Sequence, residues 1–398
     1  MCYPSFYDLF NQLFGLKIEL FKLFHTFGFF VAMGFIVGIY ILKKELQRRE
    51  KLGLFQLKYQ KVIYGAKMSW TDLIFPAIIG FLIGWKALGV LQNLPIVGEN
   101  PGEYFLSLQH GNVFVGIIVA ALFVAYEYRM LKKDERDTPE EKMEPILPSN
   151  STSIIMVVAA VSGVLGSNLF NTLEHPEQLK ELLTDPSSLV SGLNIFGGLI
   201  CAGLTLLVYA YLKKINVPHL FDSMAPAFLV AYGIGRLGCQ TAGDGCWGVP
   251  HTDPKPAFVP QILWAWSYEN NIINECDPYQ GQVAGKPQVD CKEVKLIEPV
   301  YPTPIYEFFI AGFLGMLLWM FRKRLTPFAG MMVSIFFIIV GLERILIEQI
   351  RVNEKANYLG FNLTQSEFIS ILLIIFGFSL GVFTYIFHSR KNKTVDEK

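Results

Sequence analysis

Residues 23–42 read LFHTFGFFVAMGFIVGIYIL, a run of 20 residues that contains no Asp, Glu, Lys or Arg. An α-helix rises about 1.5 Å per residue, so this run extends about 30 Å, the thickness of the hydrocarbon core of a bilayer. An amphipathic opening rather than a basic segment precedes the run, and no small-residue cleavage site follows it. We therefore interpret it as a retained membrane-spanning helix rather than a signal peptide.

Runs of this kind recur along the whole chain of 398 residues. Hydrophobic residues make up 52% of the chain and charged residues only 17%, whereas soluble proteins carry about 25% charged residues. This deficit predicts an all-α polytopic membrane protein with about nine transmembrane helices and one long extracytoplasmic loop. The predicted spans lie at 24–42, 71–92, 112–127, 154–173, 192–212, 222–240, 304–321, 328–349 and 367–388.

The charge balance excludes some classes of function. Lys plus Arg and Asp plus Glu both number 34, so the net charge is zero. The balanced charge therefore gives no support for nucleic-acid binding, which requires a basic face, and it excludes a disordered acidic tail, which requires an excess of negative charge.

The sequence also contains no recognisable metal-ligand cluster, phosphate-binding glycine loop or Ser-His-Asp arrangement, so we expect no metal and no cofactor.

Basic residues alternate between the two sides of the predicted spans. Lys and Arg cluster after the first, third, fifth, seventh and ninth spans, whereas residues 93–111 contain none and residues 173–188 contain only Lys180. Positively charged loops remain in the cytoplasm. The pattern therefore predicts an N-terminus outside the cytoplasm and a C-terminus inside it.

The long outer loop, 241–303, is rich in Pro, Gly, Asn and Trp and predicts an ordered extracytoplasmic cap. It contains Cys276 and Cys291. In an oxidising compartment the two could form a disulfide, and the alternative is two unrelated free thiols.

Three groups of ionisable side chains interrupt the predicted spans, where such residues are costly and mark functional sites. Arg236 lies near the end of the sixth span, and the alternative to a function is a snorkelling interfacial arginine. The spacing of Arg344, Glu348 and Arg351 predicts one helix face, which suits either phosphate binding or a structural ion pair. Glu307 begins the seventh span, where the helix dipole alone favours an acidic residue.

The predicted topology brings these groups to one depth of the membrane. The sixth and eighth spans run outward and the seventh runs inward, so Arg236, Arg344 and Glu307 all lie near the outer-leaflet headgroups. Two arginines held there by acidic partners suit the phosphate of a phospholipid. We expect the three side chains to lie close together in space.

The same residues resemble the motifs of the prolipoprotein diacylglyceryl transferase family. The order of the motifs along the chain also matches. The matching segments are Phe27-Gly28, Phe196-Gly197-Gly198-Leu199, Asp222 with Ala225-Pro226, Gly235-Arg236-Leu237-Gly238 through Asp244 and Trp247-Gly248, Tyr301 through Glu307, and Arg344 with Glu348 and Arg351.

The resemblance implies five regions in the chain and a place in the bacterial inner membrane. The predicted regions are a first span with a basic loop at 1–70, two inserted spans at 71–150, transferase spans at 151–240, the cap at 241–303 and the C-terminal spans at 304–398. This sequence departs from the family where Phe196 and Tyr301 replace histidines, Phe27 replaces a tyrosine and Cys239 replaces an asparagine. We interpret the chain as a divergent branch whose arginines and acids are kept.

The resemblance further implies a reaction and its substrates. The family transfers the diacylglyceryl group of phosphatidylglycerol to the lipobox cysteine of a prolipoprotein signal peptide, which forms a thioether and releases glycerol-1-phosphate. The proton acceptor stays open among Glu348, Asp244 and Glu307. The predicted catalytic residues are Arg236, Arg344, Glu348 and Asp244, and the predicted substrate-binding residues are Arg236, Arg344, Arg351, Glu307, Gly248, Gly197, Gly198, Cys239, Phe27 and Phe196.

Two other functions also fit an intramembrane charge cluster. One is a lipid transporter, although transporters favour inverted repeats with charges at the midplane. The other is a catalytically inactive lipid- or lipoprotein-binding protein, which the replacements at Phe27 and Phe196 motivate.

Overall fold

The computed structural model describes residues 1–55, 58–92, 97, 111–136, 138–174, 195–279, 293–353, 355–358 and 360–396. The chain divides into two compact units, one formed by Met1–Phe55 with Ala210–Lys398 and the other by Gln56–Tyr209. Arg236, Arg344 and Glu307 all belong to the first unit.

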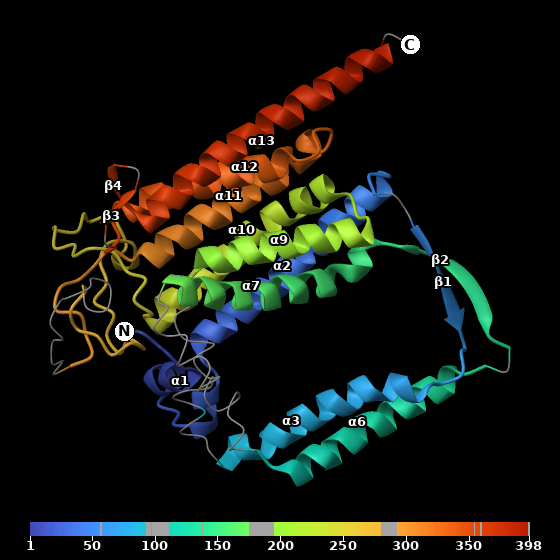
Figure 1. The fold of residues 1–398 in the computed structure, drawn as a ribbon. Coiled ribbons are helices and arrows are strands. Elements are labelled where there is room, and N and C mark those ends of the chain that lie inside the picture. Colours follow the sequence, from blue (N-terminus) through green and yellow to red (C-terminus); the bar gives the residue numbers. More distant parts are fainter. Residues whose placement is uncertain are drawn as a thin grey trace. The chain divides into compact units, whose positions relative to one another are not determined.

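The first unit is a bundle of long helices with α10 at its centre (Figure 1). Helix α10 packs against α2, α11 and α12, while α13 packs against α12. The helices are α1 Phe6–Phe14, α2 Thr26–Lys51, α10 Val217–Ala242, α11 Thr303–Leu325, α12 Met331–Glu348 and α13 Gln365–Asp396, with short 3₁₀ turns at Glu19–Leu23 and Gln261–Leu263. The strands β3 Lys355–Tyr358 and β4 Phe361–Thr364 pair antiparallel between α12 and α13.

Small residues let the helices of this bundle approach closely. A Cβ added at Gly34 of α2 would lie 2.7 Å from the carbonyl oxygen of Ala231 in α10. A Cβ at Gly315 of α11 would lie 2.9 Å from Cγ2 of Val230. Helix α10 is therefore fixed against two neighbours by contacts that leave no room for a larger side chain.

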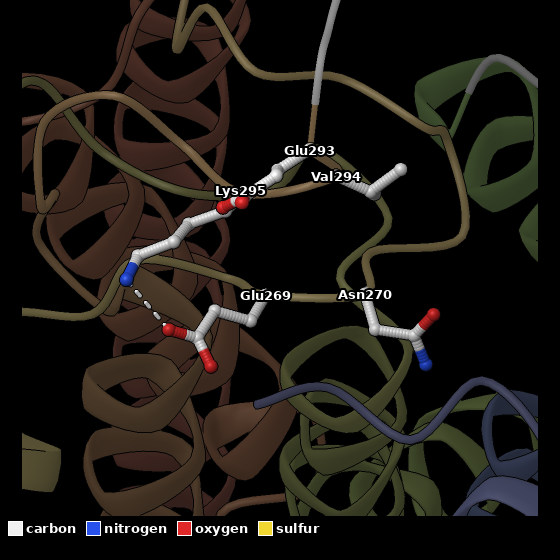
Figure 2. Close-up of a pocket in the computed structure, with 5 residues that line it drawn as sticks. All are labelled: Glu269, Asn270, Glu293, Val294 and Lys295. Carbon is white, nitrogen blue, oxygen red and sulfur yellow. Dashed lines mark ion pairs between the residues drawn. The ribbon is translucent and has the colours of Figure 1, made fainter.

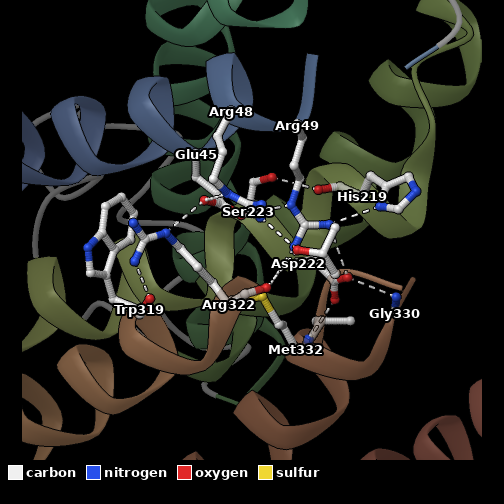
Figure 3. Close-up of polar contacts among 12 residues, drawn as sticks. Glu45, Arg48, Arg49, His219, Asp222, Ser223, Trp319, Arg322, Gly330 and Met332 are labelled. Carbon is white, nitrogen blue, oxygen red and sulfur yellow. Dashed lines mark hydrogen bonds and ion pairs between the residues drawn. The ribbon is translucent and has the colours of Figure 1, made fainter. Parts of the chain in front are cut away.

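A buried ion network joins α2, α10 and the start of α12 (Figure 3). The Arg49 guanidinium lies 2.9 Å from Glu45 and 3.4 Å from Asp222, and all three side chains are 0% exposed. Asp222 also accepts the backbone N–H groups of Gly330, at 2.9 Å, and Val333, at 3.0 Å. One carboxylate thus ties α10 to both α2 and the first turn of α12, where helix N–H groups lack partners of their own.

Two further arginines complete this network from the partly exposed side. Arg48 donates to both oxygens of Glu45, at 2.9 and 2.6 Å, and to the hydroxyl of Thr326 at 2.7 Å. Arg322 lies 3.3 Å from Glu45 and stacks on the Trp319 ring, 3.8 Å from its centroid. Asp222 and Arg236 are 14 positions apart on α10, so this network lies about 21 Å along the helix axis from Arg236.

The second unit holds two helix pairs and a long two-stranded ladder. Helices α3 and α6 pack together at glycines, since a Cβ at Gly84 would lie 2.5 Å from Val119. Helices α7 and α9 approach in the same way at Gly166 and Gly197. The elements are β1 Lys58–Tyr64, a 3₁₀ turn Trp70–Leu73, α3 Ile74–Gln92, α6 Val113–Asp134, β2 Glu140–Ile146, a 3₁₀ turn Pro148–Ser151, α7 Thr152–Glu174 and α9 Ile195–Lys213.

The predicted all-α polytopic class is confirmed. Among the described residues, seven helical stretches are long and apolar enough to cross a membrane, and they lie in α2, α3, α6, α7, α9, α11 and α13. The two other predicted spans correspond to α10, which carries Arg236, and α12, which carries Arg344 and Glu348. The sequence prediction lacked the two small sheets, in which β1 pairs with β2 and β3 with β4.

Candidate active site

Arg236 and Arg344 meet at a single carboxylate. Arg236 lies in the last two turns of α10 and pairs with Glu307, in the second turn of α11. The other Glu307 oxygen lies 3.4 Å from Arg344 of α12, and the Tyr232 hydroxyl donates to it at 3.3 Å. Glu307 is 0% exposed. The structure therefore brings together the three residues that the topology placed at one depth.

Two more groups hold Arg344 in place. Its guanidinium lies 3.0 Å from Glu348, one turn further along α12, and donates to the Ser366 hydroxyl at 3.0 Å. Glu348 in turn accepts from the side-chain amide of Asn353 at 2.6 Å. The Arg344 Nε–H remains buried and makes no hydrogen bond to any described residue. A guanidinium fixed on one edge with a free N–H on another is arranged to bind a second anion.

Arg351 does not continue the helix face that its spacing predicted. Helix α12 ends at Glu348, and Arg351 lies in extended chain that forms an isolated bridge with Gly248. The helix ends in two tighter turns, in which the N–H groups of Ile350 and Arg351 donate to the carbonyls three residues earlier, and the Ile350 carbonyl then accepts the backbone N–H of Val249 at 2.8 Å. The Arg351 Nε–H is also buried without a hydrogen bond to the described residues. We call Arg236, Arg344 and Arg351 the arginine cluster.

The loop after α10, residues 243–246, turns back toward Arg236, and we call it the glycine loop. Gly243 and Gly245 take φ values of +68° and +85°, a region that glycine enters without steric cost. Arg236 Nη1 consequently lies 3.3 Å from the Cys239 sulfur and 3.5 Å from the Cys246 sulfur. Asp244 accepts the backbone N–H of Cys246 at 3.2 Å.

Burial and neighbouring charges tune the groups of this loop. Burial raises the pKa of Asp244 to about 7. A hydrogen bond from Cys239, assisted by the nearby charges of Arg236 and Arg351, holds the pKa of the Cys246 thiol well below its usual range, although burial opposes this. The loop thus brings the Cys246 thiol and the Asp244 carboxyl group beside Cys239 of α10 and Arg236.

Gly248 lies where two chain segments meet. Its N–H donates to the carbonyl of Tyr301 at 2.9 Å, and the residue is buried. A Cβ at this position would lie 2.5 Å from the Ile350 carbonyl oxygen and 2.8 Å from the Tyr301 Cβ. These two atoms could move away from an added Cβ only if the loop separated from the segment that carries Arg351.

Gly248→Ala is therefore expected to lower the free energy of unfolding by about 1–3 kcal/mol, the usual cost of overpacking. Thermal unfolding in detergent measures this change. Gly235→Ala is the matched control, because an added Cβ there meets nothing within 4 Å and helix propensity favours alanine. Equal unfolding temperatures for the two variants would contradict the predicted clash.

The other predicted site residues include one that contacts α10 and three that belong to the second unit. Phe27 is 41% exposed, and its backbone lies against Gly238 of α10. Phe196, Gly197 and Gly198 belong to the second unit, where the two glycines pack against α7.

Sequence analysis missed two residues of the site. Glu343 is 7% exposed, interacts electrostatically with Glu307 and Arg344, and has one oxygen without a hydrogen bond to the described residues. The signal was present, because an acid precedes Arg344 in an apolar helix. Cys246 was also missed, since only the turn at Gly243 and Gly245 brings its sulfur to Arg236.

The segment between α10 and α11, described over 243–279 and 293–302, we call the cap loop. Its core comprises buried Trp247, Tyr268, Leu296 and Val300, against which Cys2 packs. Cys276 is disulfide-bonded, while Cys291, its predicted partner, lies outside the described residues.

A shallow hollow in the cap loop does not involve the arginine cluster (Figure 2). It is lined by Glu269, Asn270, Glu293, Val294 and Lys295. Lys295 pairs with Glu269 at 2.7 Å, and both side chains are largely exposed. Exposed pairs of this kind contribute little to stability or binding, so the candidate site is the arginine cluster.

Comparison with known families now bears on this geometry. The family model described as prolipoprotein diacylglyceryl transferase matches residues 135–383, a segment that contains every member of the arginine cluster. The chain belongs to this family. The match begins after α6, so α2, α3 and α6 lie outside it.

Several curated members of the transferase family are similar to the chain at modest identity. A phosphatidylglycerol–prolipoprotein diacylglyceryl transferase of Clostridium tetani is 28% identical over 56% of this chain and 76% of its own length. A protein of the same name from Streptococcus equi subsp. zooepidemicus is 24% identical over 70% of this chain and 90% of its own length. One from Leptospira interrogans is 24% identical and covers 88% of this chain and 86% of its own length.

Proposed function

We propose that this protein transfers the diacylglyceryl group of phosphatidylglycerol to the lipobox cysteine of a prolipoprotein. The cysteine sulfur attacks the glyceryl carbon that bears the phosphate ester. A carbon–sulfur bond forms, the carbon–oxygen bond breaks, and glycerol-1-phosphate leaves with the electron pair. The thiol proton passes to a carboxylate of the enzyme.

The observation that carries this proposal is the pair of arginines on the buried Glu307, of which Arg236 is buried and Arg344 is partly exposed. Arg236 and Arg344 are held by the same carboxylate, and Arg344 and Arg351 each keep a buried Nε–H without a hydrogen bond to the described residues. Leaving such a donor unpaired costs about 1–3 kcal/mol, which a bound anion would recover. A phosphate that gains charge as its ester bond breaks would be bound more tightly in the transition state than in the ground state.

The position of Asp244 supports it as the proton acceptor. Glu307 is engaged by Arg236, Arg344 and Tyr232, and Glu348 by Arg344 and Asn353. Asp244 instead follows the end of α10 on the glycine loop, beside the thiols that face Arg236. We propose that an incoming substrate thiol approaches from this side of the arginine cluster.

We further propose that the cluster lies at the outer leaflet of the bacterial inner membrane, with the N-terminus periplasmic and the C-terminus cytoplasmic. The alternation of basic loops supports this orientation. The cap loop would then face the periplasm, where prolipoproteins emerge.

Complementation tests the proposed activity. The chain is expressed in cells depleted of their own transferase, and thioether-lipidated preprotein is measured by mass spectrometry. We expect lipidation to be restored by the parent chain and by Arg324→Ala, which replaces an exposed arginine outside the cluster. A well-folded parent chain that restores no lipidation would favour the inactive lipid-binding alternative and overturn the proposal.

A further inference from the structure

Three side chains with metal-binding atoms converge at the end of α10. The Cys239 and Cys246 sulfurs and a carboxylate oxygen of Asp244 all lie within 4.8 Å of one another. Cys239 is 6% exposed, and the other two are partly buried. The family resemblance accounts for neither thiol, since it expects an asparagine at position 239 and carries no residue to position 246.

The local fold explains why these groups meet. Cys239 lies in the last turn of α10, which ends at Ala242, and Gly243 caps the helix with its N–H donating to the Cys239 carbonyl at 2.9 Å. The left-handed conformations of Gly243 and Gly245 then return the chain on itself. Asp244 and Cys246 therefore face back toward the turn that carries Cys239.

The spacing of the three ligand atoms fits a tetrahedral metal ion after a small adjustment. Zn²⁺ binds thiolate sulfur at about 2.3 Å, so two sulfurs in one tetrahedral site lie about 3.8 Å apart. Every pair of ligand atoms here lies within 4.8 Å, so no separation exceeds the tetrahedral value by more than about 1 Å, a distance that side-chain rotation on a glycine loop can close. Two sulfurs and one oxygen form a ligand set that zinc and similar thiophilic ions accept, with a fourth position open.

We propose that Cys239, Asp244 and Cys246 form a binding site for a thiophilic divalent cation of the zinc class. On binding, any proton that a ligand still carries is released to solvent, so that all three ligands are anionic. Together with the Arg236 guanidinium, which contacts both sulfurs, they carry a formal charge of minus two. A divalent cation cancels this charge at a site where uncompensated charge is costly.

The site adjoins the arginine cluster without using its phosphate-binding groups. A cation there would engage Asp244 and the sulfurs that Arg236 now contacts, so it would compete with the proposed transfer reaction. Binding of the cation requires neither lipid nor preprotein, so the cation site can be tested even if the proposed transfer activity is wrong.

Cadmium titration of the full-length chain in detergent, with the Cys276 disulfide intact and Cys239 and Cys246 as free thiols, tests the site. Cd²⁺ bound to thiolate gives an ultraviolet charge-transfer band. We expect one Cd²⁺ per chain, loss of the band in Cys239→Ser and in Cys246→Ser, and at least about tenfold weaker binding in Asp244→Asn. Cys201→Ser is the control, because Cys201 is a free thiol in the second unit and its loss should leave the band unchanged.

Two results would overturn the proposal. One is a folded parent chain, verified by its thermal unfolding transition, that gives no charge-transfer band. The other is a band that survives in the Cys239→Ser/Cys246→Ser double variant or disappears in Cys201→Ser. The first result depends on no variant, so a misfolded variant cannot hide it.

Discussion

Arg236→Ala is expected to reduce diacylglyceryl transfer by about 10²–10³-fold, the usual effect of removing one donor that stabilises developing negative charge. Arg236 contacts Glu307 directly and faces the thiols of Cys239, in α10, and Cys246, in the loop that follows. Arg236→Lys should recover little of the activity, because an ammonium group cannot reproduce a planar guanidinium fork. The same relation should hold for Arg344→Lys and Arg344→Ala. Initial rates of thioether formation on a lipobox peptide, with phosphatidylglycerol vesicles, measure these effects.

Folding must be separated from catalysis in this experiment. Removing Arg236 leaves the fully buried Glu307 short of a partner, and breaking a buried pair costs about 3–5 kcal/mol. The unfolding temperature of each variant is therefore measured beside its rate, and Arg324→Ala serves as a control for loss of one positive charge. If Arg236→Lys were as active as the parent, a positive charge alone would suffice. If Arg236→Ala were as active as the parent, Arg236 would have no role in the reaction.

Arg49→Met is expected to lower the free energy of unfolding by about 3–5 kcal/mol, because it leaves the buried Asp222 carboxylate without its arginine, while Glu45 keeps Arg48 and Arg322. Arg49 pairs with Glu45 at 2.9 Å and Asp222 at 3.4 Å, and none of the three side chains is exposed. Its guanidinium also lies 2.9 Å from Nδ1 of His219. Thermal unfolding of the purified chain in detergent measures the loss.

Lys51→Met is the matched control for this prediction. It removes a positive charge from the same helix end, at an exposed position, so it should leave the unfolding temperature nearly unchanged. If the two variants unfolded at the same temperature, the network that joins α2, α10 and α12 would not hold them together.

Much of the helical architecture follows from the sequence, because an apolar run long enough to cross a bilayer has few other stable forms. The common depth of Arg236, Arg344 and Glu307 followed from span direction and the cost of buried charge, whereas their contact with one another was a hypothesis that needed the structure. Arg351 was placed wrongly because its helical spacing does not show that the backbone at Ile350 bonds to the cap loop instead.

Features that depend on contacts between residues far apart in the chain could not be predicted from the sequence. Arg49 was interpreted only as part of a basic cytoplasmic loop, since nothing local indicates that Asp222, 173 residues away, is its partner. The approach of Cys246 to Arg236 depends on the backbone conformation of two glycines. The strand pairing of β1 with β2 joins segments separated by two helices, and charged, weakly alternating strands give little signal.

A cryo-electron microscopy structure of the chain with phosphatidylglycerol tests the central proposal most directly. We expect the lipid phosphate within hydrogen-bonding distance of both Arg236 and Arg344, with the Arg344 Nε–H among its donors. A headgroup bound elsewhere, while both guanidinium groups remain engaged only with Glu307, would contradict the proposed role of the arginine cluster.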